Sequence, residues 1–161
     1  VGAVIRSKKI QELVAVPPAS TVADAVAIMS RRELGAIVVR DGGGPVDGIF
    51  TERDLMRRVV DAGLDPTTTP IAEVMSPNVR RVPAVATIEE ALRLMVVHGY
   101  RHLLVEEGAA TLGLISIRDL MAAMVLPDES IAHEGRVGVI RSRAEEAVRS
   151  LQDMGNKPPS A

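Results

Sequence analysis

The sequence lacks cysteine and tryptophan altogether, and its 161 residues include one phenylalanine and one tyrosine. Without cysteine the chain has no disulfide, no thiol nucleophile and no cysteine-bound zinc, which fits a reducing compartment and an expected cytoplasmic location. With so few aromatic rings it also lacks the stacking platforms that single-stranded nucleic acids use. Any nucleobase held here would therefore have to lie between aliphatic side chains.

Strong net charge and long apolar runs are also missing. The formal net charge is −2, so there is no bulk electrostatic attraction to nucleic acid or to an anionic membrane, and we expect neither as a partner. No stretch approaches 18 consecutive apolar residues, and no charged start leads into an apolar core, so we expect no membrane span and no secretion signal. Hydrophobic residues still make up 47% of the chain, which at this length supports a buried core.

One motif occurs twice. Residues 48–56 read GIFTERDLM, and residues 113–121, which lie 65 positions later, read GLISIRDLM. In each copy a glycine opens a short apolar run, a hydroxyl residue follows, and an aspartate comes three positions after it. This pattern predicts a strand that ends where a helix begins. The hydroxyl group can cap that helix, and the free N–H groups of the first turn favour an anion beside them.

The repeat extends well upstream of the motif. Residues 21–29 match residues 87–95, and residues 37–39 match residues 103–105, both with an offset of 66. The offset changes to 65 within the glycine-rich turn at 42–44, where a fold tolerates an insertion. The chain therefore contains two copies of one unit.

Hydrophobic spacing predicts the same five elements in each unit. The first unit is expected to contain strands at 14–16, 36–40 and 46–50, a helix at 22–33, and a helix after Asp54 that ends at Gly63. The second is expected to contain strands at 79–82, 102–106 and 111–115, a helix after Thr87 and a helix at 117–126. Thr21 with Asp24, and Thr87 with Glu90, have the spacing of capping boxes. The inward positions expected after Asp54 are Leu55, Met56, Val59 and Val60.

These elements define an α+β fold made of two β-α-β-β-α repeats. Strands linked by a helix should be parallel with a right-handed crossover, and the hairpin adds an antiparallel pair. A unit of three strands and two helices has a small core, so we expect the two to pack with pseudo-twofold symmetry, sheet to sheet or helix to helix, leaving two related clefts. The predicted divisions are 1–69 for the first repeat with its lead-in and linker, 70–126 for the second, and 127–161 for a tail with a helix at about 141–154.

Over residues 5–126 the pattern resembles a tandem pair of cystathionine β-synthase (CBS) domains, called a Bateman module. The resemblance depends on the small-apolar-apolar-[Ser/Thr]-x-x-Asp motif in both copies, on Met-Ser-Pro at 75–77 and on Arg-His-Leu-Leu-Val at 101–105. It implies a regulatory module that senses an adenine nucleotide such as AMP, ADP or ATP in the cleft between its repeats. It also implies a homodimer that passes the signal to a partner protein or domain.

The resemblance also implies ligand contacts. In the family the aspartate accepts hydrogen bonds from the ribose hydroxyls, the Ser or Thr contacts phosphate or ribose, and a basic pair opening the second strand faces the phosphates. An arginine before each aspartate could add charge, and adenine would lie near 14–16 or 79–82. The candidate ligand-binding residues are Thr51, Arg53, Asp54, Arg101, His102, Ser116, Arg118 and Asp119. Because the first unit has Gly35 and Ala36 in place of Arg101 and His102, we do not expect equal occupancy of the two clefts.

Two other interpretations stay open at this point. Both hydroxyl–aspartate pairs could be plain capping boxes, and the repeats could form a dimerisation scaffold that binds no ligand. The sequence offers no nucleophile with a base, so we expect no catalytic residues and no enzyme activity. His133 has no second histidine at a ligand spacing, so we also expect no metal site and no obligatory cofactor.

Overall fold

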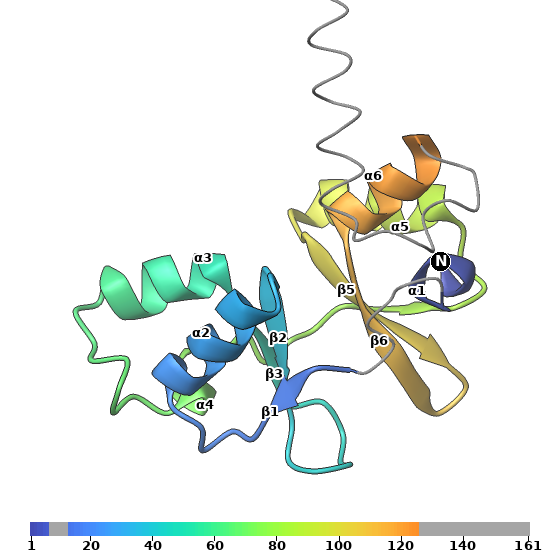
Figure 1. Ribbon diagram of the computed structural model, residues 1–161. Helices are drawn as coiled ribbons and strands as arrows, with labels where there is room; N and C mark the ends of the chain where they lie inside the picture. The colour runs from blue at the N-terminus through green and yellow to red at the C-terminus, as the bar shows by residue number, and fades with distance from the viewer. Residues whose placement is uncertain (7–12, 126–161) are drawn as a thin grey trace, which may run out of the picture.

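The computed structural model describes residues 1–6 and 13–125, and Figure 1 shows two units, each with its own sheet and helices. The first unit contains β1 (Ala15–Val16), α2 (Val22–Arg31), β2 (Ala36–Val39), β3 (Gly48–Thr51), α3 (Glu52–Asp54) and the π-helical segment η1 (Leu55–Val60). The second contains β4 (Arg81–Pro83), α5 (Ile88–His98), β5 (His102–Glu107), β6 (Ala110–Ser116) and α6 (Ile117–Val125). Two short lead-in helices, α1 (Gly2–Arg6) and α4 (Ile71–Val74), precede the repeats.

Both sheets have the same topology. In the first, β1 is parallel to β2 and β2 is antiparallel to β3, in the order β1-β2-β3. The second has the order β4-β5-β6 with the same directions. The register repeats too, since Ala15 lies opposite Val38 and Arg81 lies opposite Leu104. The predicted α+β class and the β-α-β-β-α order are confirmed.

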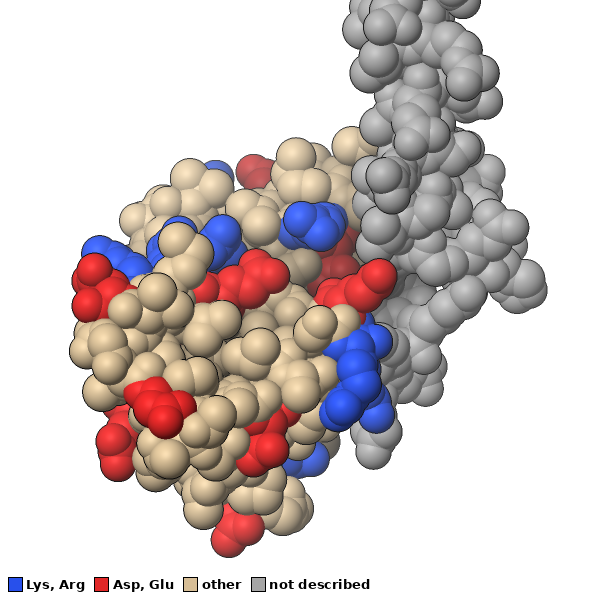
Figure 2. Space-filling view, turned by 60° about the vertical axis from the view of Figure 1, so that its left-hand side comes forward, with Lys and Arg blue, Asp and Glu red and all other residues tan. Residues whose placement is uncertain are grey.

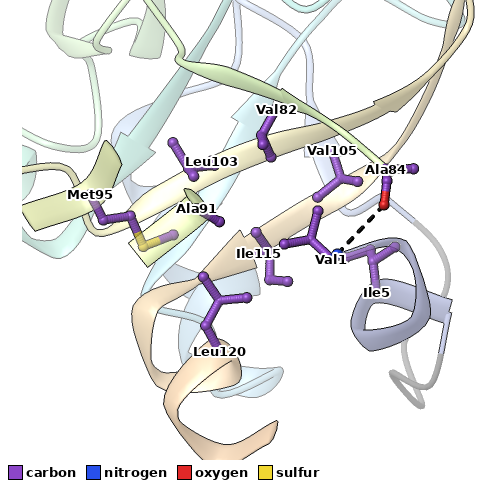
Figure 3. Packing of buried hydrophobic residues seen from close by; sticks show 10 residues of the cluster. All are labelled: Val1, Ile5, Val82, Ala84, Ala91, Met95, Leu103, Val105, Ile115 and Leu120. Atoms are coloured by element: carbon purple, nitrogen blue, oxygen red, sulfur yellow. Dashed lines mark hydrogen bonds between the residues drawn. The ribbon is translucent and has the colours of Figure 1, made fainter. Parts of the chain in front are cut away.

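Each unit buries its own helical stripe against one face of its sheet. In the first unit Val22, Ala25 and Met29 of α2 pack with Phe50 and Ile37. These positions have the three- and four-residue spacing of one helix face, and the capping boxes predicted at Thr21 and Thr87 are present. The second unit has a matching aliphatic core, which Figure 3 shows at close range.

The other faces of the two sheets pack against each other. A third cluster of buried residues joins Val38 and Ile49 of the first unit to Leu104 of the second, with Leu114 packed beside them. Val38 and Leu104 are equivalent positions of the two repeats, as are Ile49 and Leu114. The interface is therefore built from matching residues, which gives sheet-to-sheet packing about a pseudo-twofold axis.

The lead-in helices are exchanged between the units. The Gly2 N–H of α1 donates to the Ala84 carbonyl of the second unit at 2.8 Å, and the Ala72 N–H of α4 donates to the Pro18 carbonyl of the first at 3.1 Å. Figure 3 shows α1 beside the core of the second unit. Although α1 belongs to the division predicted at 1–69, its contacts are with the second unit. Each unit is thus completed by the helix that precedes the other repeat.

The exchange explains the glycine that opens each motif copy. A Cβ atom on Gly48 would lie 2.7 Å from Met75 Sδ and 2.8 Å from the Ser76 carbonyl oxygen, both at the end of α4. A Cβ on Gly113 would lie 3.1 Å from Ile5 of α1. The lead-in helices approach so closely because these positions have no side chain.

The segment joining the two units is an ordered turn that covers the start of α2. The Asp65 carboxylate accepts hydrogen bonds from the N–H and the hydroxyl of Thr67 at 2.8 and 2.7 Å. The first free N–H group of α2, on Val22, donates to the Thr69 carbonyl at 3.0 Å. The start of this helix is therefore satisfied by protein atoms and offers no anion site.

One core assignment was wrong. Of the four residues expected to point inward after Asp54, Val59 is buried and Leu55 is partly buried, but Met56 and Val60 are 67% and 70% exposed. Adjacent residues lie about 100° apart around a helix, so a one-sided core takes only one of each neighbouring pair. The other member of each pair remains on the outer surface.

The predicted helix at 141–154, with the rest of 127–161, lies outside the described residues. Within residues 1–6 and 13–125, every helix is too short or too polar to cross a membrane.

Candidate functional site

Both motif copies form the same hydrogen-bonded box. In the first, the Thr51 N–H donates to Asp54 Oδ2 at 3.0 Å, and the Asp54 N–H donates to Thr51 Oγ1 at 3.2 Å. In the second, the Ser116 N–H donates to Asp119 Oδ2 at 2.9 Å, and the Asp119 N–H donates to Ser116 Oγ at 3.2 Å. Each pair therefore caps the helix that follows it, and one carboxylate oxygen of each aspartate is used in doing so.

The two boxes lie at the same end of the pair. Thr51 pairs with Ala36 and Ser116 with His102, so each box adjoins the first residue of the central strand of its sheet. Figure 1 shows α3 and α6 at the upper end of the two units, with both hairpin turns at the lower end. The repeat and the pseudo-twofold packing thus bring the two predicted sites to one end of the molecule.

Residues of the two units meet at this end. A Cβ atom on Gly35 would lie 3.6 Å from Glu52 Oε2 and 3.9 Å from His102 Nε2. His102, which begins β5 in the second unit, therefore lies near Gly35 of the first, and Glu52 of α3 lies near the same glycine. Both distances are ordinary van der Waals contacts, so a small residue at position 35 fits beside this imidazole.

Asp54 is enclosed by protein. Its side chain is part of a residue only 8% exposed, and its second oxygen, Oδ1, accepts from Ser76 Oγ at 3.1 Å and lies 3.4 Å from Arg58 Nε. The Arg58 guanidinium also donates to the carbonyl oxygens of Val74 and Met75 at the end of α4. Asp54 and Arg58 together fasten the exchanged helix α4 to the motif of the first unit.

The second site is built differently. Asp119 is partly buried rather than buried, and the position equivalent to Arg58 is Ala123. The position equivalent to Arg58 therefore has no guanidinium group in the second unit. His102 is partly buried at the same strand end as Ser116, and Arg101 is exposed next to it.

The other two candidates are surface residues. Arg53 and Arg118, which precede the two aspartates, are both exposed. Among the described residues, no three His, Asp or Glu side chains gather in a way that could hold a metal ion. Acidic and basic side chains are interspersed over the face of the molecule in Figure 2, which fits the small net charge.

Three residues at this end of the molecule were not predicted from the sequence to belong to the site. Ser76 and Arg58 enclose Asp54, and Glu52 lies near His102. Arg58 follows Asp54 by four positions, and that spacing is a recognisable signal for a pair on one helical face. Nothing in the sequence predicts Ser76, because its contact depends on the exchange of α4.

A pocket of about 480 Å³ borders β1, where the sequence placed one of two possible adenine positions. Its wall includes residues 13–17, and none of the eight candidate residues is among its described lining residues. Its other lining residues are Ile28, Arg31, Arg32, Arg40 and Gly42.

The chain is similar in sequence to known proteins. The family described as "CBS domain" matches residues 1–61 and 71–126. An uncharacterised 17.7 kDa protein of Acidianus ambivalens is 33% identical over 111 residues, covering 68% of this chain and 66% of that protein. Arabinose 5-phosphate isomerase of Salmonella typhimurium is 39% identical over 107 residues, which are 66% of this chain but 32% of the isomerase. The chain thus spans less than two thirds of these curated relatives.

In two solved structures the match covers most of the solved chain. A CBS-domain containing protein from Agrobacterium tumefaciens superimposes with a TM-score of 0.71 and 32% identity, over 77% of this chain and 92% of that one. A hexameric CBS-CP12 protein from bloom-forming cyanobacteria superimposes with a TM-score of 0.65 and 26% identity, over 96% and 87% of the two chains.

Proposed function

The chain belongs to the CBS-domain family, and from that premise we propose that it is a regulatory module that binds an adenine nucleotide between its two repeats. The ligand is AMP, ADP, ATP or a related adenosyl compound, and binding is coupled to a partner protein or domain. The proposal assigns binding and no turnover. The observation that carries it is the recurrence of the hydroxyl–aspartate box at one end of a pseudo-symmetric pair.

We assign the nucleotide to the second box. Ser116 is paired with His102 across the sheet, and the neighbouring Arg101 is exposed and cationic, so the basic pair adjoins this box in the strand register. A carboxylate can accept hydrogen bonds from a ribose diol, and arginine and histidine can bind phosphate. At the first box, Ser76 and Arg58 already engage Asp54, which supports a structural role for that aspartate.

The proposal is tested by titrating AMP, ADP, ATP, S-adenosylmethionine and NAD into the protein by calorimetry, with thermal shift as a second readout. At least one should bind, at one site per chain. Asp119→Asn keeps the size of the side chain but removes its charge, and it should weaken binding about tenfold or more. The matched change Asp54→Asn should leave the affinity within about twofold at a temperature where both variants are folded.

A scaffold without a ligand is the second candidate, and a specific observation favours it. Both aspartates act as helix caps, and Asp54 is fully engaged by protein groups, so neither box requires a ligand to explain it. Under this alternative the ligand panel gives no heat and no stabilisation. That result would remove the nucleotide proposal and leave the scaffold.

We further propose that the module is a homodimer formed through its outer helices. Exposed apolar side chains recur at equivalent positions of η1 and α6, with Met56 and Met121 at 67% and 50% exposure and Val60 and Val125 at 70% and 71%. Isolated apolar residues are common on surfaces, but a duplicated set on two helices of one pair is typical of an interface. Light scattering should give twice the chain mass, and Met56→Glu with Met121→Glu should give the monomer.

A further inference from the structure

The pocket beside β1 is a second candidate site, separate from the two boxes. One wall is aliphatic and comes from β1 and its flanks, and β1 is an edge strand of its sheet. Its volume of about 480 Å³ is within the usual range for small-molecule sites, which is roughly 300–1,000 Å³.

Three arginines line this pocket. Arg31 and Arg32 are at the end of α2, and Arg40 follows β2. The Nε atom of Arg40 is buried and has no hydrogen-bond partner. Within residues 1–6 and 13–125, none of the three forms an ion pair. The described lining of the pocket therefore contains three positive charges and no acidic residue, and an anion could neutralise these charges.

The second unit provides an internal comparison. The position of Arg40 is occupied there by Glu106, and the position of Ala15 by Arg81; these two form an ion pair at 3.0 Å. His98, at the position of Arg32, stacks on Tyr100 with 5.7 Å between ring centroids. In the second unit these polar groups are thus paired within the protein, whereas the described lining of the pocket in the first unit has three arginines and no acidic residue.

A purely structural role explains part of this cluster. Arginines in the last turn of a helix complement the negative end of its dipole, which accounts for Arg31 and Arg32 at the end of α2. The helix dipole does not account for Arg40, which follows β2 and has a buried Nε atom without a hydrogen-bond partner.

We propose that this pocket binds a phosphorylated small molecule, with its phosphates on the three arginines and its apolar part against β1. The planar guanidinium group matches the oxygens of a phosphate, and three of them in one pocket suit two or more negative charges. The site does not depend on nucleotide binding at Asp119, because that residue is not among the residues described around the pocket.

Inorganic pyrophosphate is the probe, titrated by calorimetry into the full chain carrying Asp119→Asn, so that the proposed nucleotide site does not contribute. Pyrophosphate should bind and should shift the amide NMR signals of Val14, Val16 and Arg40. Arg31→Gln with Arg32→Gln should weaken it about tenfold or more. The control Arg93→Gln, an exposed arginine on α5 that pairs with Glu89, should bind as the parent does.

A second variant distinguishes loss of the binding site from loss of the fold. Ala15→Arg with Arg40→Glu introduces into the first unit the ion pair that the second unit holds at these positions, so the fold should tolerate it. It should abolish pyrophosphate binding. Three results would overturn the proposal. The chain carrying Asp119→Asn alone could fail to bind pyrophosphate, or the pocket variants could bind it as tightly as the Arg93→Gln control does. The third such result is a set of NMR shifts confined to residues outside the pocket.

Discussion

Replacing Asp54 by alanine should cost clearly more stability than the same change at Asp24. Both aspartates close a capping box of nearly identical geometry, with the hydroxyl-to-carboxylate distance at 2.7 Å in each. Asp24 is exposed, and within residues 1–6 and 13–125 its side chain forms no hydrogen bond outside the box, so Asp24→Ala should cost up to about 1 kcal/mol. Asp54 is buried and also accepts from Ser76 at 3.1 Å, with Arg58 at 3.4 Å.

The additional loss comes from these two partners. A hydrogen bond to a charged group contributes about 1.5–3 kcal/mol, and a buried partner left without its acceptor adds a cost of its own. Arg58 is 45% exposed and can turn to water, so its share is discounted. We therefore expect about 3 kcal/mol for Asp54→Ala, which is a fall in melting temperature of about 6–12 °C for a chain of this size.

Urea unfolding followed by far-ultraviolet circular dichroism measures both changes, and a double-mutant cycle of Asp54→Ala with Ser76→Ala isolates the bond between the two. The coupling should be about 1–2 kcal/mol. If Asp54→Ala costs no more than Asp24→Ala, or if the coupling is zero, then α4 is not held by this contact and the reasoning fails.

Two further predictions concern packing and pH. Gly48→Ala should destabilise by about 1–3 kcal/mol because the new Cβ would meet the Ser76 carbonyl at 2.8 Å, whereas Gly43→Ala, with no atom within 4 Å, should change the urea midpoint little. Hydrogen bonds from the backbone N–H and the hydroxyl of Thr87 hold the pKa of Glu90 below its usual 4.5, so their stabilisation is present above that pH and is lost as pH falls through the lower, folded-state pKa. Urea midpoints measured between neutral pH and about pH 3 should therefore fall less steeply in Glu90→Gln, and an unchanged slope would contradict this.

The sequence alone determined the repeat and the elements within it. The duplicated motif and the helical spacing gave the order of strands and helices, because period and capping chemistry act over a few neighbouring residues. The capping boxes, both sheets and the pseudo-twofold relation agree with those predictions. The expected ligand contacts followed from resemblance rather than from geometry, and they remain a proposal.

The tertiary structure decided what each copy of the motif does. The two repeats are equal in pattern, yet the exchanged helix α4 brings Ser76 to Asp54, and Arg58 closes that site from four residues away. The position of the core likewise determined that Leu55 is partly buried while its neighbour Met56 is exposed. Local spacing determines which residues share a helix face, but contacts between distant segments depend on packing, which short-range periodicity does not encode.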